Sequence, residues 1–96
     1  MLKDKILKEL KKYKSNEFIE KIGLFGSIAN DSYKNSSDID ILLSFKNIDI
    51  NKKDKLLKSL KSNIENSFNR KVDILDEKTI FLPTIKKIIE KSCIYV

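Results

Sequence analysis

The chain has 96 residues, of which 41% are hydrophobic and 35% charged, with a formal net charge of +6. This balance favours one folded domain over residues 1–96, and excludes a disordered or membrane-spanning chain. Lysines interleaved with acidic residues carry the positive charge, so direct nucleic-acid binding is not expected. The single cysteine, Cys93, permits no internal disulfide, and charged residues interrupt the first apolar ones, unlike a signal peptide. We expect a cytoplasmic protein.

Apolar periodicity predicts three elements in the first third of the chain. Residues 2–13 place apolar side chains on one face, which is typical of an amphipathic helix. Residues 18–25 form a predicted strand, in which Gly23 indicates a close approach of backbone or side chain. A Gly-Ser turn ends this strand, and a short helix is expected within residues 27–33.

The remaining chain continues the alternation of strands and helices. The nearly continuous apolar run at 38–45 predicts a strand covered on both faces. The other predicted elements are a helix at 52–68, a strand at 71–75, a helix at 84–91 with Ile85, Ile88 and Ile89 inward, and a short terminal strand at 93–96. This order predicts an α/β (α+β) fold, with helices packed on a small mixed sheet of three to four strands.

Asp38 and Asp40 begin the second predicted strand. Side chains at i and i+2 of a strand point to the same face, so the two carboxylates project together and repel each other. A bound Mg²⁺ would neutralise them, since Mg²⁺ is held by one or two carboxylates together with substrate phosphates. Taken alone, the pair is a weak signal and is better explained as solvated residues at a strand end.

Gly26 and Ser27 follow the first predicted strand. Backbone N–H groups at such a turn bind phosphate oxygens, glycine allows close approach, and the serine hydroxyl adds a donor. Taken alone, the pair is better explained as an ordinary glycine turn with Ser27 as a helix cap.

Asp73 lies inside the apolar third strand, where an unpaired charge is costly. If this strand neighbours the second, Asp73 completes a carboxylate triad with Asp38 and Asp40. Three acids would hold two divalent ions for phosphoryl chemistry, and Asp73 would also serve as a general base. The alternative is an ordinary salt bridge from Asp73 to a lysine or to Arg70.

In combination, these motifs resemble the polymerase-beta-type nucleotidyltransferase superfamily, and most closely its minimal nucleotidyltransferase branch. The pattern is Gly26-Ser27, then Asp38-Ile39-Asp40, then an acid on a later strand, Asp73. The resemblance implies a polymerase-beta-like core with Asp38, Asp40 and Asp73 as catalytic metal ligands for two Mg²⁺ ions. It also implies ATP as substrate and a nucleotide site that includes Gly26, Ser27, Lys34 and Ser37.

The chain departs from the family in one loop. Members often carry Gly-Ser-Arg-Ala-Arg-Gly, whereas Ile28, Asn30 and Asp31 stand here at the two arginines and the second glycine. Lys34 is the basic residue that remains in the loop.

Three functions are compatible with these residues. The resemblance implies transfer of AMP from ATP to a hydroxyl, typically a tyrosine of a HEPN-domain RNase toxin, by a small antitoxin encoded beside it. The second is a non-catalytic antitoxin that neutralises the toxin by binding, which the missing loop arginines favour. The third is nucleotidyl transfer to a small molecule, which ranks lower because such relatives generally carry an additional domain.

Overall fold

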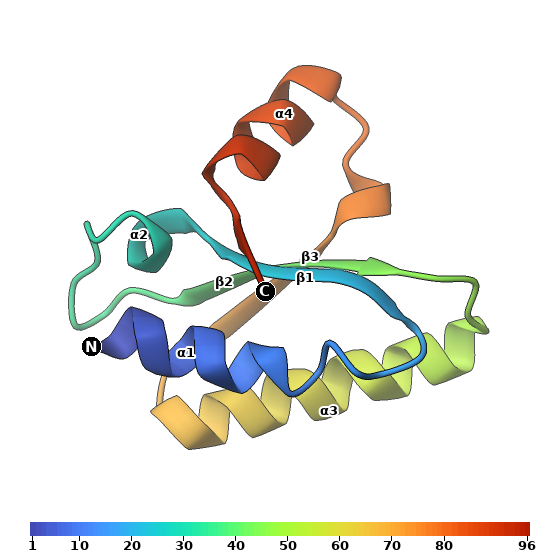
Figure 1. Cartoon of the computed structure of the whole chain (residues 1–96), viewed down its shortest axis with the longest axis horizontal. Coiled ribbons are helices and arrows are strands. Elements are labelled where there is room, and N and C mark those ends of the chain that lie inside the picture. Colours follow the sequence, from blue (N-terminus) through green and yellow to red (C-terminus); the bar gives the residue numbers. More distant parts are fainter.

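The computed structural model describes residues 1–96, which form four α-helices, one short 3-10 helix and four strands (Figure 1). In chain order they are α1 (Leu2–Lys11), β1 (Ile19–Phe25), α2 (Gly26–Ala29), β2 (Ile39–Phe45), α3 (Ile50–Phe68), β3 (Val72–Asp76), η1 (Glu77–Thr79), α4 (Pro83–Ser92) and β4 (Ile94–Tyr95). Every helix and strand predicted from the sequence is present, with ends that coincide with the prediction or differ by up to four residues. The 3-10 helix η1 lies between β3 and α4 and was not predicted.

The four strands form one mixed sheet in the order β3-β2-β1-β4. Strand β1 pairs antiparallel with both β2 and β4, whereas β2 and β3 are parallel. Helix α3 provides the long crossover that a parallel pair needs. The predicted α/β class and mixed sheet of three to four strands are therefore confirmed.

Local signals explain where the crossover helix begins and ends. The Asp49 side chain accepts a hydrogen bond from the Asn51 backbone N–H at 3.1 Å, which caps the start of α3. Asn69 adopts the left-handed conformation (φ +52°) at the C-cap, where the chain leaves the helix. The next residues enter β3.

The main core lies between one face of the sheet and helices α1 and α3, which lie together on that side in Figure 1. Full burial of one such aliphatic side chain stabilises the fold by about 1.5 to 3 kcal/mol. The core side chains that are completely inaccessible are Ile6, Leu10, Leu24, Ile28, Ile39, Ile41, Leu43, Leu60, Ile64 and Val72. Alternation along β2 and β3 directs Asp40 and Asp73 to the opposite face, which we call the acid face.

Strand β4 crosses β1 at Gly23. A Cβ atom at Gly23 would lie 2.5 Å from Cys93 Sγ and 2.9 Å from the Ile94 carbonyl oxygen. The close approach that Gly23 predicts is therefore confirmed. The pKa of the half-buried Cys93 thiol is raised to about 11, mainly by burial. The hydrogen bond with Tyr95 lowers this pKa, and the charges of Glu77 and Glu90 raise it slightly.

The prediction for the last helix is partly wrong. Helix α4 stands over the acid face (Figure 1), but no residue of it is buried. Ile85 and Ile88 are 45% and 63% exposed instead of pointing inward, and Ile89 is half-buried. Lys86 and Glu90 are also half-buried, so the helix is rotated with its apolar side away from the sheet. None of the helices combines the length and apolar content needed to span a membrane.

Candidate active site

The sheet register brings the three predicted acids to one end of the acid face. Asp40 and Asp73 are direct partners across the parallel strands β2 and β3. Asp38 lies two residues before Asp40, immediately ahead of β2. The condition set by the sequence, that the third strand neighbours the second, is met.

None of these three carboxylates has a partner within the protein. The four ion pairs of the structure involve other acids, and no side-chain hydrogen bond reaches Asp38, Asp40 or Asp73. The alternative in which Asp73 pairs with a lysine or Arg70 is therefore wrong. Burial raises the pKa of Asp40 above its ordinary value, and the charges of Asp73 and then Asp38 raise it further. The protein thus keeps mutually repelling acids together although it carries 20 lysine and arginine residues.

Gly26 lies directly against Asp40. A Cβ atom at Gly26 would be only 2.2 Å from Asp40 Oδ2, and the residue has φ +77°, which side chains rarely adopt. Only glycine satisfies both conditions without strain. The predicted phosphate-binding turn therefore lies against one of the predicted metal ligands, Asp40, although the two are separated by more than ten residues in the sequence.

The donor set suits Mg²⁺, a hard ion that prefers carboxylate oxygens. Asp38, Asp40 and Asp73 offer such oxygens with no competing partner, and the missing Cβ of Gly26 leaves room beside Asp40. No group of three acidic, histidine or cysteine side chains is arranged to hold one metal ion in the present conformation. Shared binding of an ion would therefore require rotation of the carboxylates toward one another.

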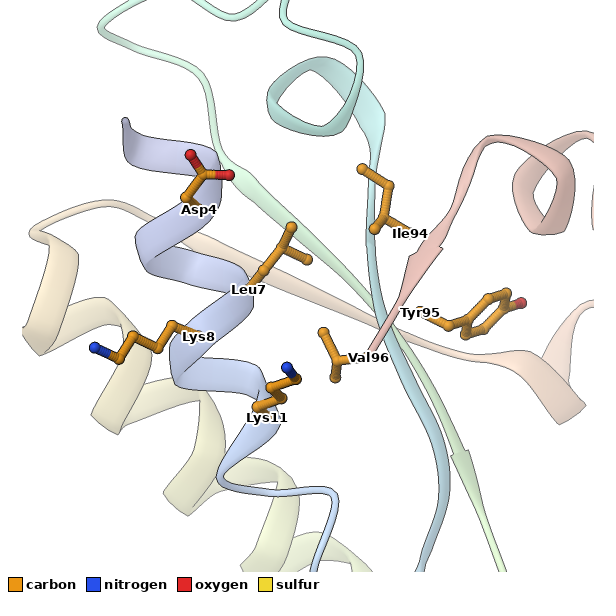
Figure 2. Close-up of a pocket in the computed structure, with 7 residues that line it drawn as sticks. All are labelled: Asp4, Leu7, Lys8, Lys11, Ile94, Tyr95 and Val96. Atoms are coloured by element: carbon orange, nitrogen blue, oxygen red, sulfur yellow. The ribbon is translucent and has the colours of Figure 1, made fainter.

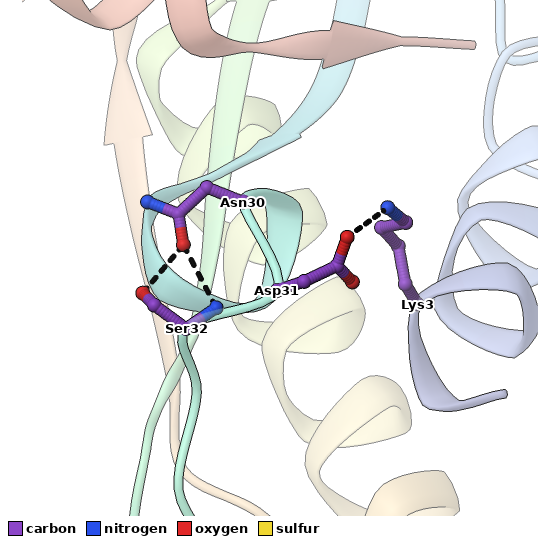
Figure 3. A network of polar contacts seen from close by, with 4 residues as sticks. All are labelled: Lys3, Asn30, Asp31 and Ser32. Carbon is purple, nitrogen blue, oxygen red and sulfur yellow. Dashed lines mark hydrogen bonds and ion pairs between the residues drawn. The ribbon is translucent and has the colours of Figure 1, made fainter.

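In the loop that departs from the family pattern, the side chains make contacts within the protein (Figure 3). Ile28 is fully buried in the core. The Asn30 side-chain oxygen accepts hydrogen bonds from the backbone N–H and hydroxyl of Ser32, at 3.0 and 2.5 Å. Asp31 forms an ion pair with Lys3 of α1 at 2.9 Å. No residue at these three positions offers a positive charge to a nucleotide.

The family comparison agrees with this geometry. The model of the nucleotidyltransferase domain family matches residues 3–96. This chain belongs to the nucleotidyltransferase family. It is 39% identical over 94 residues to a Methanocaldococcus jannaschii protein named "Putative protein adenylyltransferase MJ1217", and the match covers 96% of this chain and 85% of the relative.

Two solved structures share the fold. One, described as a "putative minimal nucleotidyltransferase", has a TM-score of 0.69 at 21% identity and covers 96% of this chain and 86% of its own. The other is a toxin–antitoxin crystallised with AMP-PNP, with a TM-score of 0.59 at 23% identity, covering 83% of this chain and 60% of that one. At these identities the likeness concerns the fold, and the minimal nucleotidyltransferase architecture is confirmed.

Arg70 is a site-supporting residue of this nucleotidyltransferase that the sequence did not assign. Its guanidinium Nη1 donates hydrogen bonds to the carbonyl oxygens of Lys34 and Ser37, at 3.1 and 2.8 Å. It also lies 5.6 Å from the centre of the Tyr33 ring. Arg70 therefore holds the loop that leads into Asp38. The only sign of this role in the sequence is that Arg70 is the single arginine of the chain.

The two other predicted nucleotide-binding residues lie in this loop. The Ser37 hydroxyl accepts a hydrogen bond from the Lys34 backbone N–H at 2.8 Å, so it closes the turn before Asp38. The Lys34 side chain is exposed. Their contacts with nucleotide stay predictions.

Surface hollows do not coincide with the nucleotidyltransferase motifs, except at Asp73. A hollow of about 330 Å³ between α1 and β4 is lined by apolar side chains, Asp4, Lys8 and Lys11 (Figure 2), and none of the predicted site residues reaches it. A smaller one of about 250 Å³ is lined by Asp73 and Ile74 of β3 and by Leu57, Lys58 and Lys61 of α3. The third acid is thus open to a molecule approaching from the sheet edge.

Proposed function

We propose that this nucleotidyltransferase transfers AMP from ATP to a hydroxyl of a partner protein, and that the modification makes it the antitoxin of that partner. The observation that carries the proposal is the unpartnered trio Asp38, Asp40 and Asp73, of which Asp40 lies directly against Gly26. The adenylyltransferase name of the relative at 39% identity supports the nucleotide and the protein acceptor. The toxin–antitoxin structure with AMP-PNP supports the biological setting.

The chemistry assigns a separate task to each part of the site. Backbone N–H groups at Gly26 and Ser27, with the Ser27 hydroxyl, would donate hydrogen bonds to phosphate oxygens. Asp38, Asp40 and Asp73 would hold two Mg²⁺ ions, which when bound neutralise phosphate charge and favour deprotonation of the attacking hydroxyl.

The transfer itself forms one bond and breaks one. The acceptor oxygen bonds to the α-phosphorus of ATP, the bond from that phosphorus to the bridging oxygen breaks, and pyrophosphate leaves. Asp73 would take the acceptor proton; its exposure and the smaller hollow beside it support this role.

We propose a HEPN-domain RNase toxin as the partner and one of its tyrosines as the acceptor, on the basis of the family resemblance of the motifs. A cytoplasmic location and a single domain over residues 1–96 stay predictions.

The test is transfer of label from α-labelled ATP with Mg²⁺ to the protein encoded by the adjacent open reading frame. Wild type should label that protein, whereas the double variant Asp38→Asn/Asp40→Asn should not. Mass spectrometry of the labelled protein would identify the acceptor residue. Equal labelling by wild type and variant, or none by either, would contradict the proposal.

A second function is neutralisation by binding alone. The loop favours it, because Ile28, Asn30 and Asp31 supply no cation beside the phosphate-binding turn. In that case Asp38→Asn/Asp40→Asn should still protect cells from the toxin. Loss of protection by a folded variant that still binds the toxin would reject occlusion. Transfer to a small molecule ranks third, and a screen of small hydroxyl compounds as acceptors would test it.

A further inference from the structure

Four large apolar side chains are exposed in one short segment at the start of α4. Phe81, Leu82, Ile85 and Ile88 are 87%, 61%, 45% and 63% exposed. We call these four residues the α4 strip. A contiguous group of exposed apolar side chains commonly marks an interaction site on a soluble protein.

The strip is not explained by packing within the chain. A helix of ten residues gains most of its stability in proteins from burying its apolar side, yet α4 buries none of its residues. Lys86 and Glu90 are more enclosed than Ile85 and Ile88. The apolar side of α4 is therefore available to another molecule.

The position of α4 relates the strip to the candidate active site. Helix α4 stands over the acid face (Figure 1), the face that carries Asp40 and Asp73. It also contacts α2, the helix that begins at Gly26. A protein that presents a hydroxyl to the acids must therefore lie close to α4.

The charges around the strip favour a partner of opposite sign over a second copy of this chain. Lys87 and Lys91 are exposed on α4, whereas its single acid, Glu90, is half-buried. A two-fold contact between copies would bring these lysines toward one another, which costs free energy. Acidic residues around an apolar patch on a different protein would pair with them.

We propose that the α4 strip docks the acceptor protein of the nucleotidyl transfer, and that this partner presents an apolar patch bordered by acidic residues. The inference rests on the proposed function, since it names where that function's acceptor binds. A few buried apolar anchors dominate such interfaces. Loss of two anchors of the strip should therefore weaken binding at least tenfold.

The experiment compares Phe81→Ser/Ile88→Gln with the control Ile50→Gln. Both changes remove exposed apolar side chains, but Ile50 is 70% exposed at the start of α3, after the end of β2 that lies away from Asp40. Calorimetric titration measures binding to the protein encoded by the adjacent open reading frame, and labelled ATP measures transfer. The rise in melting temperature with ATP and Mg²⁺ reports on the nucleotide site independently.

The strip variant should lose at least tenfold in affinity and in transfer at low partner concentration, while its nucleotide-dependent melting shift equals that of wild type. Ile50→Gln should match wild type in all three measurements. Undiminished binding by the strip variant, or no binding by wild type, overturns the inference. So does a wild-type dimer that becomes monomeric in the strip variant. Normal binding without transfer by wild type would instead contradict the proposed function and leave the docking role standing.

Discussion

At the scale of single residues, the site is defined by Gly26 and Asp40. The absence of a Cβ at Gly26 lets the Asp40 carboxylate approach the turn, and the φ of +77° makes the same position unfavourable for any other residue. Asp40 is destabilised as an anion by burial and by two neighbouring acids. Such strain is typical of functional sites, where a ligand removes it.

The raised pKa of Asp40 predicts that removing its negative charge stabilises the fold, by an amount that depends on pH. The folded protein binds the Asp40 proton more tightly than the unfolded chain does. The protonated carboxyl therefore contributes fully to folding stability below pH 3.8, the ordinary pKa of the group, and this contribution is lost as pH rises through the folded pKa. Asp40→Asn should therefore raise the melting temperature at pH 7 in EDTA, and change it little near pH 3.5. The control is Asp54→Asn, an exposed acid of α3. A pH-independent effect of Asp40→Asn would contradict the prediction.

Gly26→Ala should destabilise the fold by about 1 to 3 kcal/mol, the usual cost of a residue held in an unfavourable backbone conformation, and should also displace Asp40. Urea denaturation measures the first effect and AMP transfer the second. In an Asp40→Ala background the cost should be smaller, because the 2.2 Å collision with the carboxylate is removed, which leaves the backbone strain and a 3.3 Å approach to the Cβ of residue 40. Equal costs in both backgrounds would show that the contact has no energetic weight.

At the scale of elements, the loop between α2 and β2 decides how the acids are presented. Its first part is held by Asn30 and by the Asp31–Lys3 pair, and its second part by Arg70 and Ser37. Asp31 has φ +64°, a left-handed backbone conformation that aspartate tolerates, at the position where the family often has glycine. The loop is therefore ordered by contacts other than those of the family pattern.

Arg70→Ala should loosen this loop and weaken nucleotide binding without touching the acids. A buried hydrogen bond from a charged donor contributes about 1.5 to 3 kcal/mol to the free energy of unfolding. Since Arg70 is partly exposed, we expect a loss of about 1 to 2 kcal/mol in urea denaturation and a smaller melting shift with ATP and Mg²⁺. Lys71→Ala removes a neighbouring exposed cation and serves as the control. Indistinguishable behaviour of the two variants would refute the anchoring role.

At the scale of the whole molecule, the two faces of the sheet have different tasks. The face toward α1 and α3 holds the apolar core, which accounts for the packing of every strand. The acid face carries the three acids and a helix with no buried residue. Stability and chemistry are thus largely separated, so variants of the acid face should affect activity more than folding.

One core shared by all strands predicts one cooperative unfolding transition. For 96 residues the enthalpy at the midpoint should be roughly 65 kcal/mol, at about 0.7 kcal/mol per residue. Scanning calorimetry should give equal calorimetric and van't Hoff enthalpies, and circular dichroism should follow the same transition. Two separated transitions would contradict the prediction of a single domain over residues 1–96.

The sequence by itself determined the elements, the mixed α/β class, the need for Gly23 and Gly26, and the family. These features follow from local spacing: apolar periodicity, glycine positions and the i, i+2 relation of Asp38 and Asp40 each appear within a few residues. Their roles in nucleotide and metal binding stay predictions.

Only the tertiary structure decided which distant residues meet. The parallel pairing of β2 and β3 places Asp73 opposite Asp40, and the fold directs Arg70 to the loop carbonyls of Lys34 and Ser37 and not to Asp73. The same holds for α4: its apolar spacing predicts an amphipathic helix, but spacing does not tell whether the apolar side meets the protein's own sheet or another molecule. That choice depends on the space left over the acid face, where Ile85 and Ile88 stay exposed.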